Sequence, residues 1–290
     1  MIEVTKEILK NIYKERKEGV RKYDFGLLVV IGGSEFYSGS PAFCALAAFR
    51  AGVDMVRIIA PKRAADIIAS FKPDLAAYPL KTERLNKNDL SALFLMVEEA
   101  KLASHGKTAV VIGGGMGRSE ETKEAIFEFL SKTSVSAVID ADGIYALEKN
   151  PEIVFGKPFV ITPHLYEFFV LTGKDISSMS FEQKIKSVEE EAKRLNTTIV
   201  LKGPIDIISN GEETALNKTG SYYMTKGGMG DTLAGILGAL LSRGISCFEA
   251  SQAATYINGL AGEIAIKKFG EGVMASDLIE AIPEVINLYK

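Results

Sequence analysis

The sequence predicts an α/β protein with a mostly parallel central sheet, helices on both faces and an antiparallel hairpin at one edge. Two observations support this prediction. Short apolar, β-branched segments recur along the chain, and longer segments with apolar residues three and four positions apart lie between them. The expected strands are Leu27–Ile31, Met55–Ala60, Ala109–Ile112, Ala137–Ile139, Phe159–Ile161 and Ile199–Leu201, and the expected helices include Ala42–Ala51, Leu90–Leu102, Glu121–Leu130 and Phe181–Leu195.

The last third of the chain differs from this alternation. A β-hairpin is predicted for Asp206–Lys218, because two apolar segments flank Asn210-Gly211, a pair typical of primed turns. Apolar residues at helical spacing follow Gly230, and a second helix is expected over Ala250–Lys268. Ser276 is expected to be the N-cap of a last helix.

Composition indicates a single globular domain over residues 1–290, with 47% hydrophobic residues and no linker or repeat. The 34 basic and 37 acidic residues leave a net charge of −3, which gives no electrostatic reason to expect nucleic acid or a membrane surface as partner. No run of about 18 apolar residues is present. We therefore expect a cytoplasmic protein with a small-molecule partner.

Ligands of open parallel sheets collect where strands end, because loops and helix N-termini converge there. The loop Gly32–Pro41 follows one strand, and Ser40 is a natural N-cap in it, although its small side chains would also admit a ligand. The loop Gly113–Gly117 has four glycines in five positions, which favours a ligand-facing role. Asp140 and Asp142 could hold a metal through water or cap the next helix.

Two further strands end in residues with chemical potential. His164, one of two histidines, follows Thr162-Pro163 and could face a substrate or serve the structure. Lys202 and Gly203 end the next strand, where a lysine could reach a phosphate or lie exposed at a turn. Both interpretations stay open for each residue.

The strongest motif is Lys226-Gly227-Gly228-Met229-Gly230-Asp231-Thr232, which begins an amphipathic helix. Its glycines expose backbone N–H groups at a helix N-terminus, which suits a phosphoryl group. Asp231 could accept a hydroxyl proton while that oxygen attacks phosphorus. Asp is also common at helix N-termini, but helix capping alone does not explain three preceding glycines.

These motifs resemble the ribokinase-like superfamily and, more closely, its nucleotide-dependent NAD(P)H-hydrate dehydratases. The resemblance runs from about Tyr23 to Ala265 and rests on motifs that occur in the family's order. They are Tyr37–Pro41, Gly113–Gly117, Asp140–Asp142, Thr162–His164 with Glu167, Leu201–Gly203, Gly227–Asp231 with Leu233–Gly235, and Gly259–Glu263. The resemblance implies a three-layer α/β/α fold.

The resemblance also implies an activity and a set of site residues. A nucleotide would phosphorylate the ring hydroxyl of the S-epimer of NAD(P)H hydrate, and loss of phosphate would restore NADH or NADPH, with Asp231 as the base. By family position the hydrate would be contacted by Ser40, Gly115, Gly117, His164 and Asp231. The nucleotide would be held by Lys202, Gly203, Pro204, Ile205, Asp206, Gly228, Met229 and Gly230.

Cofactors and partners follow from the same resemblance. Mg²⁺ is expected to bridge the phosphates of ADP or ATP, with no dedicated protein cage. A homotetramer is expected. Many relatives carry an attached epimerase domain, for which 290 residues leave no room, so a separate epimerase would supply that step.

Four positions depart from the family's usual residues. The family usually has Ala at Ser40, Pro at Gly114, Thr or Ser at Met229 and His at Asn258. Two alternatives remain: a kinase of a small alcohol such as a thiazole or sugar, which would keep the same fold and site, and a non-catalytic nucleotide-binding protein, which Met229 and Asn258 favour.

Overall fold

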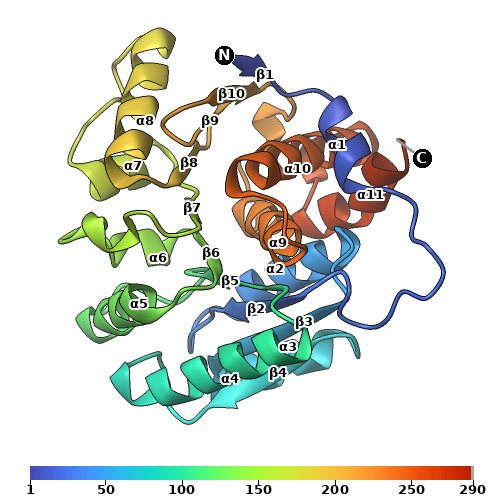
Figure 1. Cartoon of the computed structure of the whole chain (residues 1–290), viewed down its shortest axis with the longest axis vertical. Helices are drawn as coiled ribbons and strands as arrows, with labels where there is room; N and C mark the ends of the chain where they lie inside the picture. Colours follow the sequence, from blue (N-terminus) through green and yellow to red (C-terminus); the bar gives the residue numbers. More distant parts are fainter. Residues whose placement is uncertain (289–290) are drawn as a thin grey trace.

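The computed structural model describes residues 1–288, whose strands form one ten-stranded sheet (Figure 1). The spatial order is β1-β10-β9-β8-β7-β6-β5-β2-β3-β4, and β2 to β8 run parallel to their neighbours within that set. The strands are β1 Ile2–Glu3, β2 Leu27–Ile31, β3 Met55–Pro61, β4 Ala76–Leu80, β5 Thr108–Ile112, β6 Ser136–Ile139, β7 Phe159–Ile161, β8 Thr198–Leu201, β9 Asp206–Ser209 and β10 Thr214–Asn217.

Helices cover both faces of the sheet, as the sequence predicts (Figure 1). One layer consists of α1 Glu7–Ile12, α2 Gly39–Arg50, α3 Lys62–Phe71, α9 Met229–Ser242, α10 Cys247–Phe269 and α11 Ala275–Asn287. The other consists of α4 Leu90–Ala103, α5 Glu120–Lys132, α6 Asp142–Tyr145, α7 Leu165–Thr172 and α8 Phe181–Leu195. Short 3₁₀ turns occupy Lys87–Asp89, Pro151–Val154, Tyr222–Met224 and Gly270–Gly272.

The central strands are mostly apolar because both of their faces are buried. In β2, Leu28 and Val30 pack under one helical layer, whereas Leu27, Val29 and Ile31 pack under the other. Burial of each such side chain away from water contributes about 1.5–3 kcal/mol to the free energy of folding. The two cores therefore hold the sheet rigidly and fix where its strands end.

The order of the strands creates a switch point between β2 and β5. From β2 the chain proceeds to β3 and β4 on one side, and it then returns to place β5 on the other side of β2. The loops that follow β2 and β5 consequently diverge at the same edge of the sheet, where open α/β sheets bind ligands.

Helix α9 lies over this point because two of its glycines allow close packing. A Cβ atom at Gly235 would lie 2.1 Å from the Cys44 carbonyl oxygen of α2, and one at Gly238 would lie 2.4 Å from a methyl group of Val111 in β5. The absence of side chains at these positions brings α2, α9 and the sheet together. Ser40 and Asp231, in the first turns of α2 and α9, meet as a result.

Most predicted elements are confirmed, and two strands went unpredicted. The β9–β10 hairpin is antiparallel at the edge of the sheet, with the two-residue β1 added parallel to β10 outside it. Strand β4 contains Pro79, which is tolerated because β4 is the opposite edge strand. Among the helices in residues 1–288, none combines the length and the apolar character needed to cross a membrane.

Two predicted helix caps are wrong. Ser38, not Ser40, is the N-cap of α2, and the Ser40 hydroxyl donates instead to a carboxylate of α9. Met274, not Ser276, is the N-cap of α11, and Asp277 accepts the Met274 N–H at 2.8 Å. Both helices therefore begin before the predicted cap.

Candidate active site

The N-terminal tip of α9 presents backbone N–H groups that no side chain caps. Its N-cap is Gly228, which has φ +94°, and a Cβ atom there would lie 2.7 Å from that of Ala275. A glycine N-cap offers no side-chain acceptor, so the N–H groups of Gly230 and Asp231 in the first turn donate to no capping side chain. The Met229 N–H donates to the Lys226 carbonyl at 3.3 Å. The free N–H groups at this tip suit an anion.

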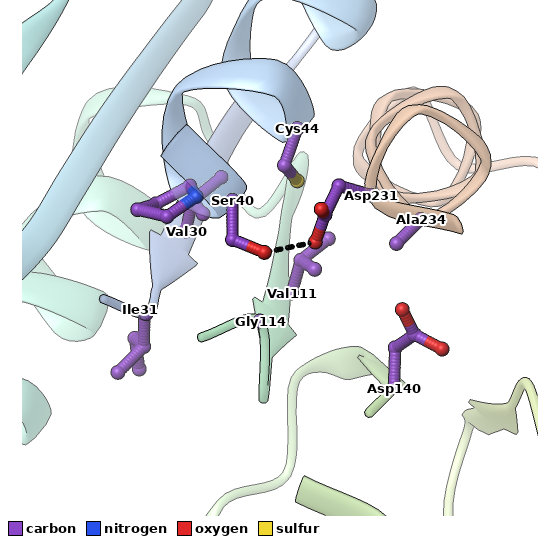
Figure 2. A pocket seen from close by; sticks show the side chains of 11 residues that line it. Val30, Ile31, Ser40, Cys44, Val111, Gly114, Asp140, Asp231 and Ala234 are labelled. Atoms are coloured by element: carbon purple, nitrogen blue, oxygen red, sulfur yellow. Dashed lines mark hydrogen bonds between the residues drawn. The ribbon is translucent and has the colours of Figure 1, made fainter. Parts of the chain in front are cut away.

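Asp231 lies in the first turn of α9 and faces α2 (Figure 2). The Ser40 hydroxyl donates a hydrogen bond to Asp231 Oδ1 at 2.5 Å. Burial raises the pKa of Asp231 to about 6, while the Ser40 hydrogen bond lowers it and the nearby Asp140 charge raises it. A carboxylate with a pKa near neutrality is suited to accept and release a proton.

A small cavity lies between Ser40, Asp231, Gly114 and Asp140 (Figure 2). Its volume is about 10 Å³, which is roughly enough for one water molecule. Its walls come from the ends of β2 and β5 and from α2 and α9. The Asp231 carboxylate thus borders the switch point of the sheet.

The glycine loop after β5 shapes one wall of this cavity. Gly113 has φ +130°, and a Cβ atom there would lie 1.8 Å from the Asp140 carbonyl oxygen, so only glycine fits. The Gly117 N–H donates to Asp142 Oδ2 at 2.8 Å, and Arg118 Nε donates to Asp142 Oδ1 at 2.8 Å. Asp142 therefore ties this loop to α6.

Asp140 has a different set of partners. Lys202 Nζ donates to Asp140 Oδ1 at 2.7 Å, and the Thr162 hydroxyl donates to the same oxygen at 2.8 Å. Lys202 Nζ also lies 3.5 Å from Glu167 Oε2. Burial by itself would lower the pKa of Lys202, but the charges of Asp140 and Glu167 raise it above its ordinary value. Lys202 is thus a largely buried, charged link between two carboxylates, and not the exposed turn lysine that was one of its two interpretations.

His164 is the N-cap of α7. Its Nδ1 accepts the N–H groups of Tyr166 at 3.1 Å and Glu167 at 3.2 Å, and Glu167 accepts the His164 N–H at 2.8 Å. Because Nδ1 accepts, the neutral imidazole carries its proton on Nε2, which lies 3.4 Å from Glu167 Oε1. The side chain is half exposed, so it combines a structural role with an edge open to a ligand.

Of the predicted nucleotide residues, 202–206 lie at a loop beside the α9 tip, and Gly228, Met229 and Gly230 are that tip. Gly203 and Pro204 are exposed, and the Gly203 N–H donates to Asp206 Oδ1 at 3.1 Å. Burial raises the pKa of Asp206 to about 6, with hydrogen bonds from Asn217 and Gly203 lowering it. Lys202 Nζ lies 3.7 Å from the place that a Cβ atom of Gly230 would occupy. The 202–206 loop and Gly228–Gly230 therefore border one region.

Comparison with known proteins decides the family. The family model described as NAD(P)H-hydrate dehydratase matches residues 28–284. The chain belongs to this family.

Among relatives of this dehydratase-family chain, the bifunctional NAD(P)H-hydrate repair enzyme of Pyrobaculum aerophilum is 40% identical over 94% of the chain and 53% of its own length. The chain thus spans about half the length of the first curated relatives it matches. The ADP-dependent (S)-NAD(P)H-hydrate dehydratase of Nitrosopumilus maritimus is 35% identical, and the match covers 98% of the chain and 96% of that protein.

Solved structures agree with the dehydratase-family fold. An ADP/ATP-dependent NAD(P)H-hydrate dehydratase from Bacillus subtilis, co-crystallised with ATP and Mg²⁺, matches with TM-score 0.79 at 22% identity, over 100% of this chain and 99% of that one. A hydroxyethylthiazole kinase from Pyrococcus horikoshii matches with TM-score 0.60 at 17% identity, over 98% of this chain and 95% of that one. Both comparisons support the ribokinase-like three-layer fold.

A second, wider cleft of about 460 Å³ opens beside the site of this family member. The two loops that line the small cavity also line this cleft, with Tyr37 on one side and Gly117 and Arg118 on the other. The volume lies in the range typical of small-molecule sites. Tyr37 is exposed and packs edge-on against Phe36 at 4.8 Å between ring centroids.

The dehydratase-family site has no protein cage for a divalent metal. Within residues 1–288 no three His, Cys, Asp or Glu side chains gather as metal ligands. Asp140 Oδ1 already accepts from Lys202 and Thr162, and both oxygens of Asp142 already accept from Gly117 and Arg118. A Mg²⁺ ion at this site would depend on nucleotide phosphates for most of its ligands.

Sequence reasoning missed how the family motifs connect. Met229 is buried, so its side chain faces the core and can offer only backbone to a nucleotide. The Thr232 hydroxyl donates to Asn258 Oδ1 at 2.7 Å, which fixes the first turn of α9 to α10. A series of side-chain contacts runs from His164 to Glu167, from Glu167 to Lys202 and from Lys202 to Asp140. It links the ends of β6, β7 and β8. The only signal for it was a polar residue at the end of each strand.

Proposed function

We propose that this chain dehydrates the S-epimer of NAD(P)H hydrate to NAD(P)H at the expense of ADP or ATP. The observation that carries this proposal is the Asp231 carboxylate, with a pKa raised by burial to about 6, beside the free N–H groups of the α9 tip. Membership of the dehydratase family and the names of the relatives from Pyrobaculum and Nitrosopumilus support the substrate.

The reaction would proceed in two stages. Asp231 accepts the proton of the ring hydroxyl while that oxygen bonds to the terminal phosphorus, and the bond from phosphorus to the shortened nucleotide breaks. Phosphate then leaves the ring carbon as the ring nitrogen donates its electron pair, and a proton leaves the adjacent carbon to restore the ring double bond. Hydroxide is a poor leaving group, whereas phosphate is a good one.

The site residues would divide this work. The N–H groups of Gly230 and Asp231 would stabilise charge on the transferred phosphoryl group. Ser40, Gly115, Gly117 and His164 would border the hydrate, and the 460 Å³ cleft beside Gly117 offers room for the rest of the dinucleotide. The loop of Lys202, Gly203, Pro204, Ile205 and Asp206, with Gly228 and the Met229 backbone, would border the nucleotide.

Lys202 would act here through charge rather than as a free phosphate ligand. Its side chain is 21% exposed, and Asp140 already holds it at 2.7 Å. A phosphate near Gly230 would feel the positive charge of Lys202 without displacing it.

Further parts of the proposal concern partners. ADP is the first nucleotide to test, because two relatives are named ADP-dependent dehydratases. Mg²⁺ would accompany the nucleotide phosphates. We also propose one domain over the whole chain, a homotetramer, a cytoplasmic location and functional pairing with an NAD(P)H-hydrate epimerase. Light scattering and cell fractionation test the tetramer and the location.

The central experiment incubates the purified protein with hydrated NADH or NADPH and either ADP or ATP, with Mg²⁺ present. We expect the absorbance of reduced nicotinamide to return and inorganic phosphate to appear in equal amount. A nucleotide-free sample is the control. No recovery with either nucleotide, together with a stable phosphoester formed from a thiazole or sugar alcohol, would replace the dehydratase by a kinase. If the protein bound nucleotide but catalysed neither reaction, the result would support the alternative of a non-catalytic nucleotide-binding protein.

A further inference from the structure

The hydroxyl of Ser40 and the carboxylate of Asp231 are 191 residues apart in sequence and 2.5 Å apart in the structure. We propose that Ser40 is a positioning residue: it holds Asp231 Oδ1 and so leaves Oδ2 free to take the proton of the substrate hydroxyl. This inference rests on the proposed function, because it assigns Asp231 as the base.

The geometry around the pair favours one arrangement of the carboxylate. Ser40 lies in the first turn of α2 but does not cap that helix, since Ser38 is the N-cap. Its hydroxyl points across the cavity to α9 (Figure 2). Within residues 1–288 Asp231 Oδ2 receives no hydrogen bond. One oxygen is therefore occupied, and the other remains available for substrate.

Gly114 leaves the room that this hydrogen bond needs. A Cβ atom at Gly114 would lie 2.9 Å from Asp231 Oδ1 and 3.1 Å from Ser40 Oγ. A side chain there would press on both partners. The loop after β5 thus accommodates the pair, and the packing of α2 against α9 at Gly235 keeps the two helices at this distance.

The titratable groups that face Asp231 come from four elements. Asp140 at the end of β6 and Asp142 in α6 disfavour its ionised form, Lys202 at the end of β8 favours it, and Cys44 of α2 lines the same cavity. Burial raises the pKa of the Cys44 thiol well above its ordinary value, so this group is neutral. Ser40 is the neutral donor in this set, and its hydrogen bond lowers the pKa of Asp231. Without it, more of Asp231 would be protonated at low pH and unable to accept the substrate proton.

The test compares wild type, Ser40→Ala and Ser38→Ala. Ser38 is a matched control because it is a serine of the same turn whose side chain makes no capping hydrogen bond. Carboxyl ¹³C NMR of aspartate-labelled protein, with the Asp231 signal assigned from Asp231→Asn, measures the titration directly. We expect the midpoint of Asp231 to rise by about one pH unit in Ser40→Ala and to stay unchanged in Ser38→Ala.

Turnover gives the second readout. The acid limb of the kcat profile should move up with the NMR midpoint, so that kcat at pH 6 falls about fivefold while the KM for nucleotide is unchanged. An unmoved midpoint in Ser40→Ala would overturn the proposal, and so would a raised KM for the hydrate at every pH with an unmoved acid limb. If wild type restores no reduced nicotinamide, the proposed function fails, but the NMR titration still decides whether Ser40 controls Asp231.

Discussion

Lys202 Nζ and Asp140 Oδ1, 62 residues apart in sequence, form an ion pair of 2.7 Å beneath the tip of α9. The Asp140 side chain is 5% exposed and that of Lys202 is 21% exposed, so water screens this pair poorly. Glu167, also 5% exposed, lies 3.5 Å from the same ammonium group. One lysine therefore compensates two buried carboxylates at the centre of the site.

Replacement of this lysine should destabilise the protein. Lys202→Met leaves Asp140 and Glu167 without their cation, and we expect the free energy of unfolding at pH 7.5 to fall by about 3–5 kcal/mol. Urea denaturation measures the loss. The matched control is Lys218→Met, which breaks an exposed pair with Glu3 and should cost about 1 kcal/mol or less. Equal losses in the two variants would contradict a buried charge role for Lys202.

Loss of the Asp231 carboxylate should abolish most turnover. Asp231→Asn keeps an oxygen that can accept the Ser40 hydroxyl but cannot take a proton, so kcat should fall by about 10²–10⁴-fold. Nucleotide affinity, measured by calorimetry, should be retained because the N–H groups of the α9 tip are unchanged. Asp66→Asn, which alters an exposed carboxylate of α3, is the control with full activity expected. Undiminished turnover in Asp231→Asn would remove Asp231 as the base.

The same variant should be more stable than wild type at neutral pH. The pKa of Asp231 is about 6 in the folded protein against an ordinary 3.8, so the folded state holds this proton more tightly than the unfolded state does. The contribution of this proton to the free energy of unfolding is fully present below about pH 4 and is lost as the pH rises through 6. Asp231→Asn should therefore gain about 1–3 kcal/mol over wild type at pH 7.5 and little at pH 4.

Urea denaturation of both proteins at the two pH values checks this linkage. Asp206, whose pKa is also raised to about 6, is present in both proteins and cancels in the comparison. A gain of the same size at both pH values would show that burial of the Asp231 charge is not its source.

The close packing of α2 and α9 gives another prediction. Gly235→Ala places a Cβ atom 2.1 Å from the Cys44 carbonyl oxygen, and backbone cannot move aside as a flexible side chain can. We expect a loss of about 1–3 kcal/mol or more, together with lower turnover as Ser40 and Asp231 separate. Gly272→Ala has no neighbouring heavy atom within 4 Å and should stay within about 0.5 kcal/mol of wild type. A tolerated Gly235→Ala would mean that the helices can shift without cost.

The structure explains why some local predictions failed while the elements were predicted well. Ser40 satisfies the sequence rule for an N-cap, yet its hydroxyl goes to Asp231 because α9 lies within reach. For Lys202 the sequence left open an exposed turn or a phosphate contact, and the structure adds Asp140, which follows β6, and Glu167 of α7 as its partners. Such contacts depend on strand order, which periodicity does not encode.

Local sequence patterns predict the alternation of strands and helices, the β9–β10 hairpin, the glycine-rich start of α9 and the position of Asp231 at that start. These features are local, because they follow from the spacing of apolar residues and from glycine at turns. The sequence also marks Ser40 and Gly114 as unusual residues without relating them.

Which of these residues meet depends on long-range packing. The placement of β5 beside β2, rather than beside β4, creates the switch point and brings Gly114 to Ser40. Packing of α9 on α2 through Gly235 then brings Asp231 to the same place. Burial of both faces of the sheet selects one strand order and one helix placement, and the cavity chemistry follows from contacts between residues far apart in sequence.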